Sequence, residues 1–233
     1  MQRPPARREG YGTSGSAAAR GPGEAGTAAA RRCPAPRHRQ GFAVLFTGLS
    51  GAGKSTLAHG VAAQLRERAG RPVTLLDGDS VRRRLSGGLG FSRADRAVHL
   101  RRVGFVAAEI ARHGGIALCA VIAPWAADRR ALRATVEAHG GFVEVHVSTP
   151  LATCEARDPR GLYARARAGL LEGFTGIDDP FEAPERPDLA VDTADTAPDA
   201  AARHVLATLE CLGYVRAPAG RGAGTGGAKE AVR

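Results

Sequence analysis

The sequence predicts an α/β fold in which a central parallel sheet is covered by helices on both faces. Short apolar runs alternate with longer segments whose apolar residues recur at helical spacing, from about residue 42 to residue 212. The apolar runs are nearly continuous and do not alternate with polar residues, which is typical of strands that are buried on both faces. Together these two observations favour a three-layer arrangement of helices, sheet and helices.

Each element of this pattern has its own local signals. Four helices are expected, and three of them have marked ends. Gly70 and Pro72 follow the first helix, and Pro198 lies near the first turn of the last. The second helix starts at Ser92 with Asp95 and stops at Gly114 and Gly115. The strands are expected at 42–46, 72–79, 116–122, 142–147 and 189–191, and the helices at 55–69, 93–112, 126–138 and 199–212. In such a sheet ligands bind at the carboxyl ends of the strands, where polar residues are expected to converge.

The two ends of the chain differ in composition from the middle. Residues 1–40 and 214–233 are rich in Ala, Gly, Pro and Arg and contain few large apolar side chains. Such segments bury too little surface to offset the entropy of ordering, so both are expected to be disordered tails. One domain is therefore expected at 41–213.

Charge argues against a nucleic-acid surface on that domain. Of the net charge of +10, the tails supply +6 and +3, which leaves +1 for the domain. Solvated Arg-rich tails are the preferred interpretation, with weak contact to RNA or anionic lipid as the alternative. The four cysteines show no metal-ligand spacing, and no long apolar stretch is present. We therefore expect a reduced, cytoplasmic protein without specific nucleic-acid or membrane partners.

The segment GLSGAGKS at 48–55 carries the most specific chemical signal. It matches G-x-x-x-x-G-K-[ST] in full and lies between a predicted strand and a predicted helix. Its backbone N–H groups and the helix N-terminus are suited to hold phosphate, with Lys54 on the terminal phosphates and Ser55 on Mg²⁺. The motif predicts a P-loop NTPase fold that binds ATP through Gly48, Ser50, Gly51, Ala52, Gly53, Lys54, Ser55 and Thr56.

The residues after the second strand indicate the acceptor of the phosphoryl group. Acids at Asp77 and Asp79 are followed by seven arginines between residues 79 and 102, which suggests a site for an anion. An acid at this place can organise Mg²⁺ or take a proton from an acceptor hydroxyl. A short domain without recognisable switch motifs therefore favours a small-molecule kinase over a GTPase or a motor ATPase.

Four longer segments resemble the adenylyl-sulfate kinase family. They are FTGLSGAGKST, LLDGDSVRRRLSGGLGFSRADR, CEARDPRGLYARARAG and FTGIDDPFEAPERPDLAVDT, and they occur in order over about residues 42–195. The family phosphorylates the 3′-hydroxyl of adenosine 5′-phosphosulfate (APS) with ATP. The resemblance thus implies ATP and APS as partners, Mg²⁺ as cofactor and, because members are often dimers, a homodimer.

The resemblance also implies roles for single residues. Lys54, Asp79 and Arg82 would be catalytic, with Asp79 as base or as a second Mg²⁺ ligand beside Ser55. Arg157 would lie over the ATP base, and residues 160–178 would form a lid of helix and loop. The residues implied to contact the acceptor are Asp79, Arg82, Phe91, Arg96, His99, Ile122, Ala123, Arg165 and Asp178. Two side chains have open alternatives: Phe91 as a core anchor, and Trp125 as lid packing or as a base contact.

Several positions depart from the family pattern. His99 stands where Asn is usual, Ala123 where a serine is usual, and Glu172 where a lid lysine is expected. Ala126 and Ala164 likewise replace polar or basic residues. Without a serine at 123, a phosphoserine cannot form there, so direct transfer from ATP is expected.

These observations leave three hypotheses of function. The first is the APS kinase reaction. The second is a kinase of the same fold with another nucleotide or metabolite hydroxyl as acceptor, to which His99, Ala123 and Glu172 point. The third is a nucleotide-binding module without catalysis, against which the intact Lys54, Ser55, Asp79 and Arg82 argue.

Overall fold

A computed structural model of the chain describes residues 36–68 and 70–216. The predicted tails lie largely outside these ranges. Within them, five strands form one parallel sheet in the order β2-β3-β1-β4-β5. The strands are β1 (Phe42–Thr47), β2 (Val73–Asp77), β3 (Ile116–Ala120), β4 (Gly141–Val147) and β5 (Leu189–Val191). The predicted parallel sheet is therefore confirmed.

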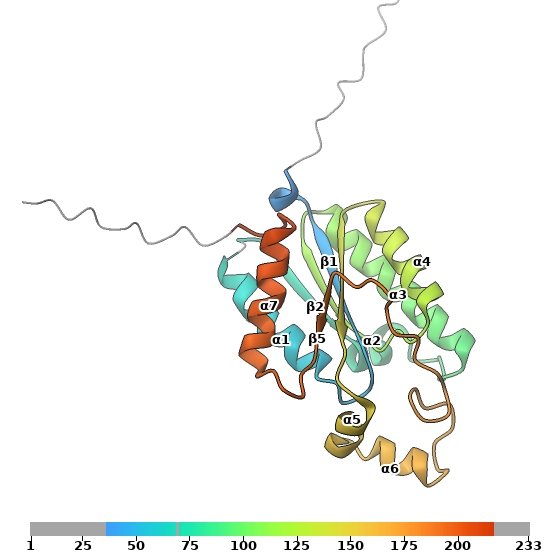
Figure 1. Ribbon diagram of the computed structural model, residues 1–233. Coiled ribbons are helices and arrows are strands. Elements are labelled where there is room, and N and C mark those ends of the chain that lie inside the picture. Colours follow the sequence, from blue (N-terminus) through green and yellow to red (C-terminus); the bar gives the residue numbers. More distant parts are fainter. Residues whose placement is uncertain (1–35, 69, 217–233) are drawn as a thin grey trace, which may run out of the picture. The chain divides into compact units, whose positions relative to one another are not determined.

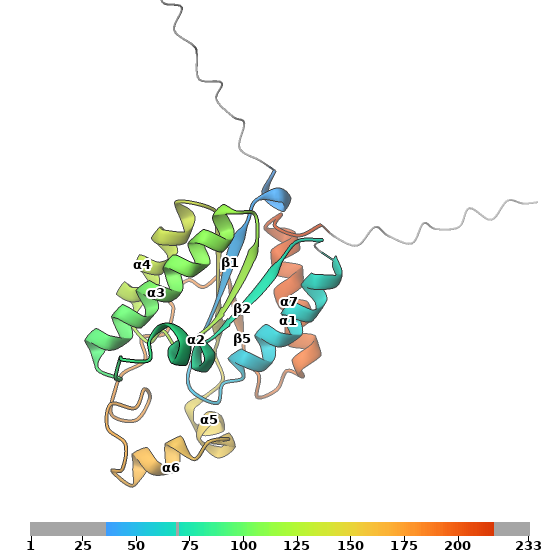
Figure 2. The same ribbon diagram turned by 180° about the vertical axis from the view of Figure 1, so that it is seen from behind.

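Helices cover both faces of the sheet (Figures 1 and 2). Helices α1 (Lys54–Arg68) and α7 (Pro198–Cys211) pack on one face through the side chains of Phe42, Val44 and Phe46. Helices α3 (Arg93–Arg112) and α4 (Ala126–Glu137) pack on the other face through Ala43 and Leu45. Successive residues of β1 thus enter two separate apolar clusters, which is why the strand has no polar alternation.

The second strand ends earlier than the sequence predicts. The Asp77 carboxylate accepts hydrogen bonds from the backbone N–H groups of Asp79 and Ser80 and so caps α2 (Gly78–Leu85). Asp79 consequently lies in the first turn of a helix and not at the tip of a strand, which corrects the predicted boundary. The short helices α5 (Leu151–Arg157) and α6 (Leu162–Arg167) were not predicted as separate elements, although α6 lies within the segment predicted to form a lid of helix and loop.

The domain extends a few residues beyond both predicted boundaries. A single 3-10 turn, η1, spans Arg37–Arg39. At the other end Tyr214 and Val215 are buried, and the Tyr214 ring centroid lies 4.9 Å from that of Phe42. Gly141 makes this contact feasible, since a Cβ there would lie 2.2 Å from the Tyr214 ring. The assignment of 37–40 and 214–216 to disordered tails was therefore wrong.

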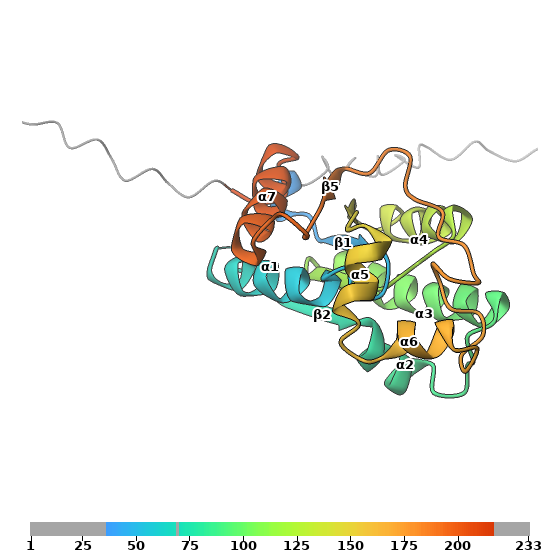
Figure 3. The ribbon, with the colours of Figure 1, turned by 60° about the horizontal axis from the view of Figure 1, so that its bottom comes forward.

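The carboxyl ends of the strands meet at one edge of the sheet. Figure 3 brings this edge toward the viewer and shows α2, α5, α6 and the segment that follows α6 arranged around it. None of the described helices combines the length and apolar character needed to cross a bilayer.

Candidate active site

A cavity of about 340 Å³ opens at the carboxyl edge of the sheet. Its walls come from the phosphate loop (residues 48–55), the start of α2, α3, the segment after β3 and the start of the predicted lid. Most of the site residues expected from the sequence line it: Ser50, Gly51, Gly53, Lys54, Ser55, Thr56, Asp79, Arg82, Phe91, Arg96, His99, Ile122 and Ala123. Residues more than 70 positions apart in the sequence are therefore brought to one site.

The phosphate loop adopts a conformation that requires glycine. Gly51 and Gly53 have φ of 73° and 93°, values that side chains with a Cβ rarely adopt. The Lys54 side chain is buried, and its Nζ donates a hydrogen bond of 2.6 Å to the Leu49 carbonyl. Burial lowers the pKa of the Lys54 ammonium to about 8. A phosphate oxygen in the loop would gain a nearby, poorly solvated cation.

Ser55 is paired with Asp77. Ser55 Oγ donates a hydrogen bond of 2.6 Å to Asp77 Oδ2. Both are hard oxygen ligands at the mouth of the phosphate loop, the donor set that Mg²⁺ prefers when phosphate and water complete its coordination. The residues at 36–68 and 70–216 contain no group of three or more His, Cys, Asp or Glu side chains that is placed to hold a metal. The paired Ser55 and Asp77 oxygens fit a metal whose other ligands are phosphate and water.

Asp79 has a different partner. Its carboxylate forms an ion pair with the guanidinium of Arg160, at the start of the predicted lid. Both side chains are about half exposed, so the pair is accessible to solvent and to ligands. Sequence reasoning missed Arg160, because the two residues are 81 positions apart and only the fold brings them together.

Arg82, Phe91 and Arg96 form a cluster on the α2–α3 side of the cavity. The guanidinium carbon of Arg82 lies 4.4 Å from the centroid of the Phe91 ring, and that of Arg96 lies 5.6 Å from it. Phe91 is 57% exposed and lines the cavity, so the alternative of a core anchor was wrong. An exposed aromatic ring beside two guanidinium groups offers a stacking surface and an anion site together.

Arg96 also ties this cluster to the segment after α6. Its Nη1 donates to Thr175 Oγ1 at 3.0 Å, Nη2 donates to the Gly173 carbonyl, and Nε donates to the Phe91 carbonyl at 2.7 Å. The guanidinium therefore links the backbone at Phe91, in the cavity wall, to the backbone at Gly173.

His99 is buried and neutral. Its Nδ1 lies 3.0 Å from Ser86 Oγ, and burial, with the neighbouring Arg82 and Arg102, lowers the pKa of the imidazole to about 4. At neutral pH it adds no charge to the cavity. In the cavity wall His99 is therefore an uncharged, hydrogen-bonding side chain, like the asparagine that is usual at this position.

Five of the expected site residues, and Trp125, lie outside the cavity lining. Gly48 and Ala52 are buried within the phosphate loop, and Trp125 is buried with Arg93 4.0 Å from the centroid of its ring. Arg157 donates to Thr193 Oγ1 at 2.8 Å and to the Thr193 carbonyl at 2.6 Å, next to the phosphate loop. Asp178 accepts from the Gly173 and Phe174 backbone N–H groups, and Arg165 is exposed. The roles implied for Arg157, Arg165 and Asp178 toward ligands stay predictions.

Comparison with known protein families shows to which family this chain belongs. The model of the adenylylsulphate kinase family matches residues 40–192, which is more than half of the chain. The chain belongs to the adenylylsulphate kinase family. The adenylyl-sulfate kinase of Synechococcus sp. strain JA-2-3B'a(2-13) is 51% identical over 177 residues, which cover 76% of this chain and 99% of the relative.

Longer proteins contain a related region. The sulfate adenylyltransferase of Aspergillus oryzae is 45% identical over 184 residues, and the match covers 79% of this chain but 32% of that protein. The chain thus spans about a third of the length of this relative.

Solved structures of adenylylsulphate kinases share the fold. The APS kinase of Mycobacterium tuberculosis, in complex with AMPPNP and APS, is 46% identical and superimposes with a TM-score of 0.70 over 73% of this chain and 98% of that one. A hexameric APS kinase from Thiobacillus denitrificans is 52% identical, with a TM-score of 0.63 over 78% of this chain and 31% of that one. The P-loop fold expected from the sequence is confirmed.

Proposed function

We propose that this chain transfers the γ-phosphoryl group of ATP to the 3′-hydroxyl of APS. The observation that carries the proposal is the shared cavity: the phosphate loop and the Arg82–Phe91–Arg96 cluster line the same 340 Å³ space, with Asp79 among its lining residues. Family membership supports the same reaction. Neither another acceptor nor a non-catalytic role is favoured by any feature of the site.

On the donor side, the backbone N–H groups of the phosphate loop and the Lys54 ammonium would bind the phosphates of ATP. Ser55 and Asp77 would hold Mg²⁺, which when bound neutralises the phosphate charge during transfer. We place Asp77 in this role instead of Asp79, because Asp77 is the acid hydrogen-bonded to Ser55.

On the acceptor side, Phe91 would stack on the adenine of APS while Arg82 and Arg96 bind its phosphosulfate. Asp79 would accept the proton of the 3′-hydroxyl as that oxygen forms a bond to the γ-phosphorus and the bond from phosphorus to ADP breaks. For this step the Asp79–Arg160 ion pair has to open. The freed Arg160 guanidinium would then face the transferring group, where added positive charge lowers the barrier.

A product assay tests the proposal. The purified chain with ATP, Mg²⁺ and APS is expected to form ADP and 3′-phosphorylated APS in equal amounts, measured by anion-exchange chromatography. AMP, adenosine and water serve as competing acceptors. Transfer to AMP or adenosine in preference to APS would support the second hypothesis. Hydrolysis of ATP by water without transfer to APS would contradict the proposed reaction, and nucleotide binding without any transfer would support the third hypothesis.

Substitutions of two neighbouring acids distinguish the proposed proton acceptor from the proposed metal ligand. Asp79→Asn is expected to lower kcat by about 10²–10³-fold while ATP still binds, because the proton acceptor is lost. Asp77→Asn is expected to raise the KM for MgATP instead, because a metal ligand is lost. Unchanged turnover in Asp79→Asn would contradict the role of the base.

We also propose that the chain forms a homo-oligomer, as the hexameric relative does. Light scattering of the purified protein would test this, and a mass of about 24 kDa would contradict it.

A further inference from the structure

The backbone after β3 contains Ala123, the one non-glycine residue among those described whose φ lies well inside the left-handed region. Ala123 has φ of 48°, a conformation that is sterically unfavourable for a residue with a Cβ. Ile122, Ala123 and Pro124 together form a wall of the cavity. Such a conformation persists only where surrounding contacts hold it.

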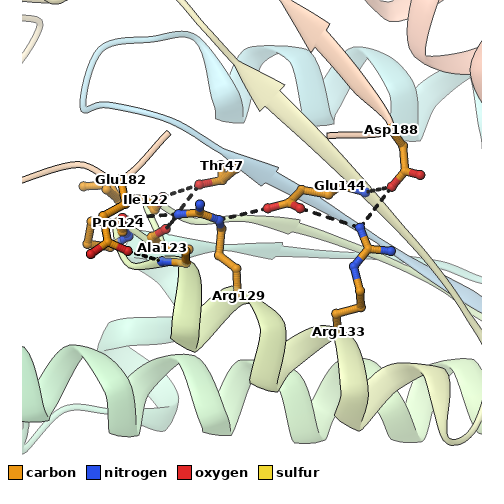
Figure 4. Close-up of polar contacts among 10 residues, drawn as sticks. Thr47, Ile122, Ala123, Pro124, Arg129, Arg133, Glu144, Glu182 and Asp188 are labelled. Carbon is orange, nitrogen blue, oxygen red and sulfur yellow. Dashed lines mark hydrogen bonds and ion pairs between the residues drawn. The ribbon is translucent and has the colours of Figure 1, made fainter. Parts of the chain in front are cut away.

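Every carbonyl of this wall is bound. The Ile122 carbonyl accepts from Thr47 Oγ1 at 2.6 Å and from the Gly48 N–H at 3.4 Å. The Ala123 and Pro124 carbonyls both accept from Arg129 Nη1, at 2.9 and 3.2 Å. Thr47 and Arg129 thus hold the wall from the sheet and from α4 (Figure 4).

Arg129 is itself held by a buried acid. Only 4% of the Arg129 residue is exposed, and its Nε lies 2.9 Å from Glu144 Oε1, on β4. Glu144 Oε2 lies 3.6 Å from Arg133, which also pairs with Asp188 at 3.2 Å. A guanidinium can face a carboxylate with one edge and two carbonyls with another, which a lysine ammonium cannot do.

The same wall is attached to the segment that returns from the lid. The Glu182 N–H donates to the Pro124 carbonyl at 2.8 Å, and Glu182 Oε2 accepts from the Ala126 N–H at 2.7 Å. The Asp188 carboxylate accepts from the Glu144 N–H at 2.7 Å. The wall, α4, β4 and residues 182–188 therefore form one connected polar unit around Arg129 (Figure 4).

We infer that Arg129, held by Glu144, is a positioning residue for the nucleotide acceptor, which acts by fixing the 122–124 backbone with Ala123 in its left-handed conformation. Arg129 is not among the cavity-lining residues, so it acts through the carbonyls that it binds. The inference rests on the proposed function, since the acceptor whose binding is measured is APS.

Arg129→Lys is the first test. The lysine keeps a cation for Glu144 but cannot also bind both carbonyls, so the KM for APS is expected to rise about tenfold or more, because small displacements of a substrate wall are costly. The KM for ATP is expected to change less than about twofold, since the phosphate loop is untouched. Glu144→Gln keeps the shape of the acid and weakens its hold on Arg129, and a smaller rise is expected.

Arg133→Gln is the matched control, because it alters the same ionic network without touching the 122–124 carbonyls. Its KM for APS is expected to equal that of the parent. If Arg129→Lys and Arg133→Gln raise the KM for APS equally, or Arg129→Lys leaves it unchanged, the inference is wrong.

Ala123→Gly in the Arg129→Lys chain tests the backbone route. Glycine adopts positive φ without steric cost, so this double variant is expected to recover at least about half of the lost affinity on a logarithmic scale. No recovery would show that Arg129 does not act through the conformation of Ala123.

One readout does not need catalysis. Amide hydrogen exchange in residues 120–126 is expected to be faster in Arg129→Lys than in Arg133→Gln. If the parent fails to phosphorylate APS, the proposed function is wrong. Equal exchange in the two variants would overturn the positioning role on its own.

Discussion

The charge on Lys54 depends directly on its burial. The pKa of its ammonium is lowered to about 8 in the free protein, and the protonated form is the one that binds phosphate. As pH rises through 8 the free protein loses this cation, so kcat/KM for ATP is expected to fall toward tenfold per pH unit. Bound phosphate stabilises the ammonium, so kcat is expected to fall only at higher pH.

Initial rates between pH 6.5 and 9.5 measure this effect. A kcat/KM for ATP that stays level through pH 9.5 would contradict a cation of lowered pKa in the phosphate loop.

His99 makes the stability of the folded protein depend on pH in the acid range. Its pKa is about 4 in the folded protein against about 6.5 when unfolded, so between these values the unfolded chain binds more protons. The contribution of the neutral histidine is therefore present above pH 6.5 and lost as pH falls toward 4. His99→Asn cannot be protonated and is expected to retain on the order of 2–3 kcal/mol at pH 4 that the parent loses.

Denaturant unfolding of both proteins at pH 7 and at pH 4 measures the difference. The exposed His139→Asn is the matched control. Equal acid sensitivity of parent, His99→Asn and His139→Asn would refute a buried neutral His99.

Single residues were predictable from the sequence where a local motif fixes them. Gly51, Gly53, Lys54 and Ser55 are consecutive or nearly so, and their geometry follows from a strand, a turn and a helix. Arg160 was not predictable, because its pairing with Asp79 depends on how the lid crosses the sheet edge. Choosing Asp77 over Asp79 beside Ser55 likewise required the helical turn that separates the two acids.

At the scale of elements, the start of α6 depends on Asp158. The Asp158 carboxylate accepts from the backbone N–H groups of Leu162 at 2.8 Å and Ala164 at 3.0 Å, which helix α6 leaves without helical partners. Asp158→Ala is expected to destabilise this helix, because two backbone N–H groups of its first turn lose their acceptor. Amide exchange at 162–167 should then be several-fold faster than in the parent.

Glu155→Gln is the control for this element, because it removes the Glu155–Arg167 ion pair at the same helix but leaves the cap. If it accelerates exchange as much as Asp158→Ala does, capping is not what orders α6.

The long helices were predictable and the short helices were not. Helix α3 was predicted at its observed bounds because Ser92 with Asp95 marks its start and two glycines follow its end. Helices α2, α5 and α6 have eight, seven and six residues, too few for an apolar period to appear. Tertiary contacts and the Asp77 and Asp158 carboxylates define them instead.

At the scale of the whole molecule, the end of the domain lies beyond the predicted one. Tyr214 packs on Phe42, and its carbonyl accepts from Arg71 Nη2 at 3.0 Å. Composition could not show this, because two apolar residues in a Gly- and Arg-rich segment form no pattern. A chain that ends at Gly213 is expected to be less stable than one that ends at Arg216 by about 3 kcal/mol, with Tm lower by roughly 10 °C.

Calorimetry of the two truncated chains provides the comparison. Equal Tm values would mean that Tyr214 and Val215 contribute nothing to the core.

The meeting of two nucleotides in one cavity underlies the proposed mechanism. The most direct measurement is a crystal structure of the chain with a non-hydrolysable ATP analogue, Mg²⁺ and APS. We expect the analogue's phosphates in the loop at 48–55, the adenine of APS against Phe91, and the 3′-hydroxyl of APS within hydrogen-bonding distance of Asp79. APS bound elsewhere, or a 3′-hydroxyl directed away from Asp79, would overturn the proposed mechanism.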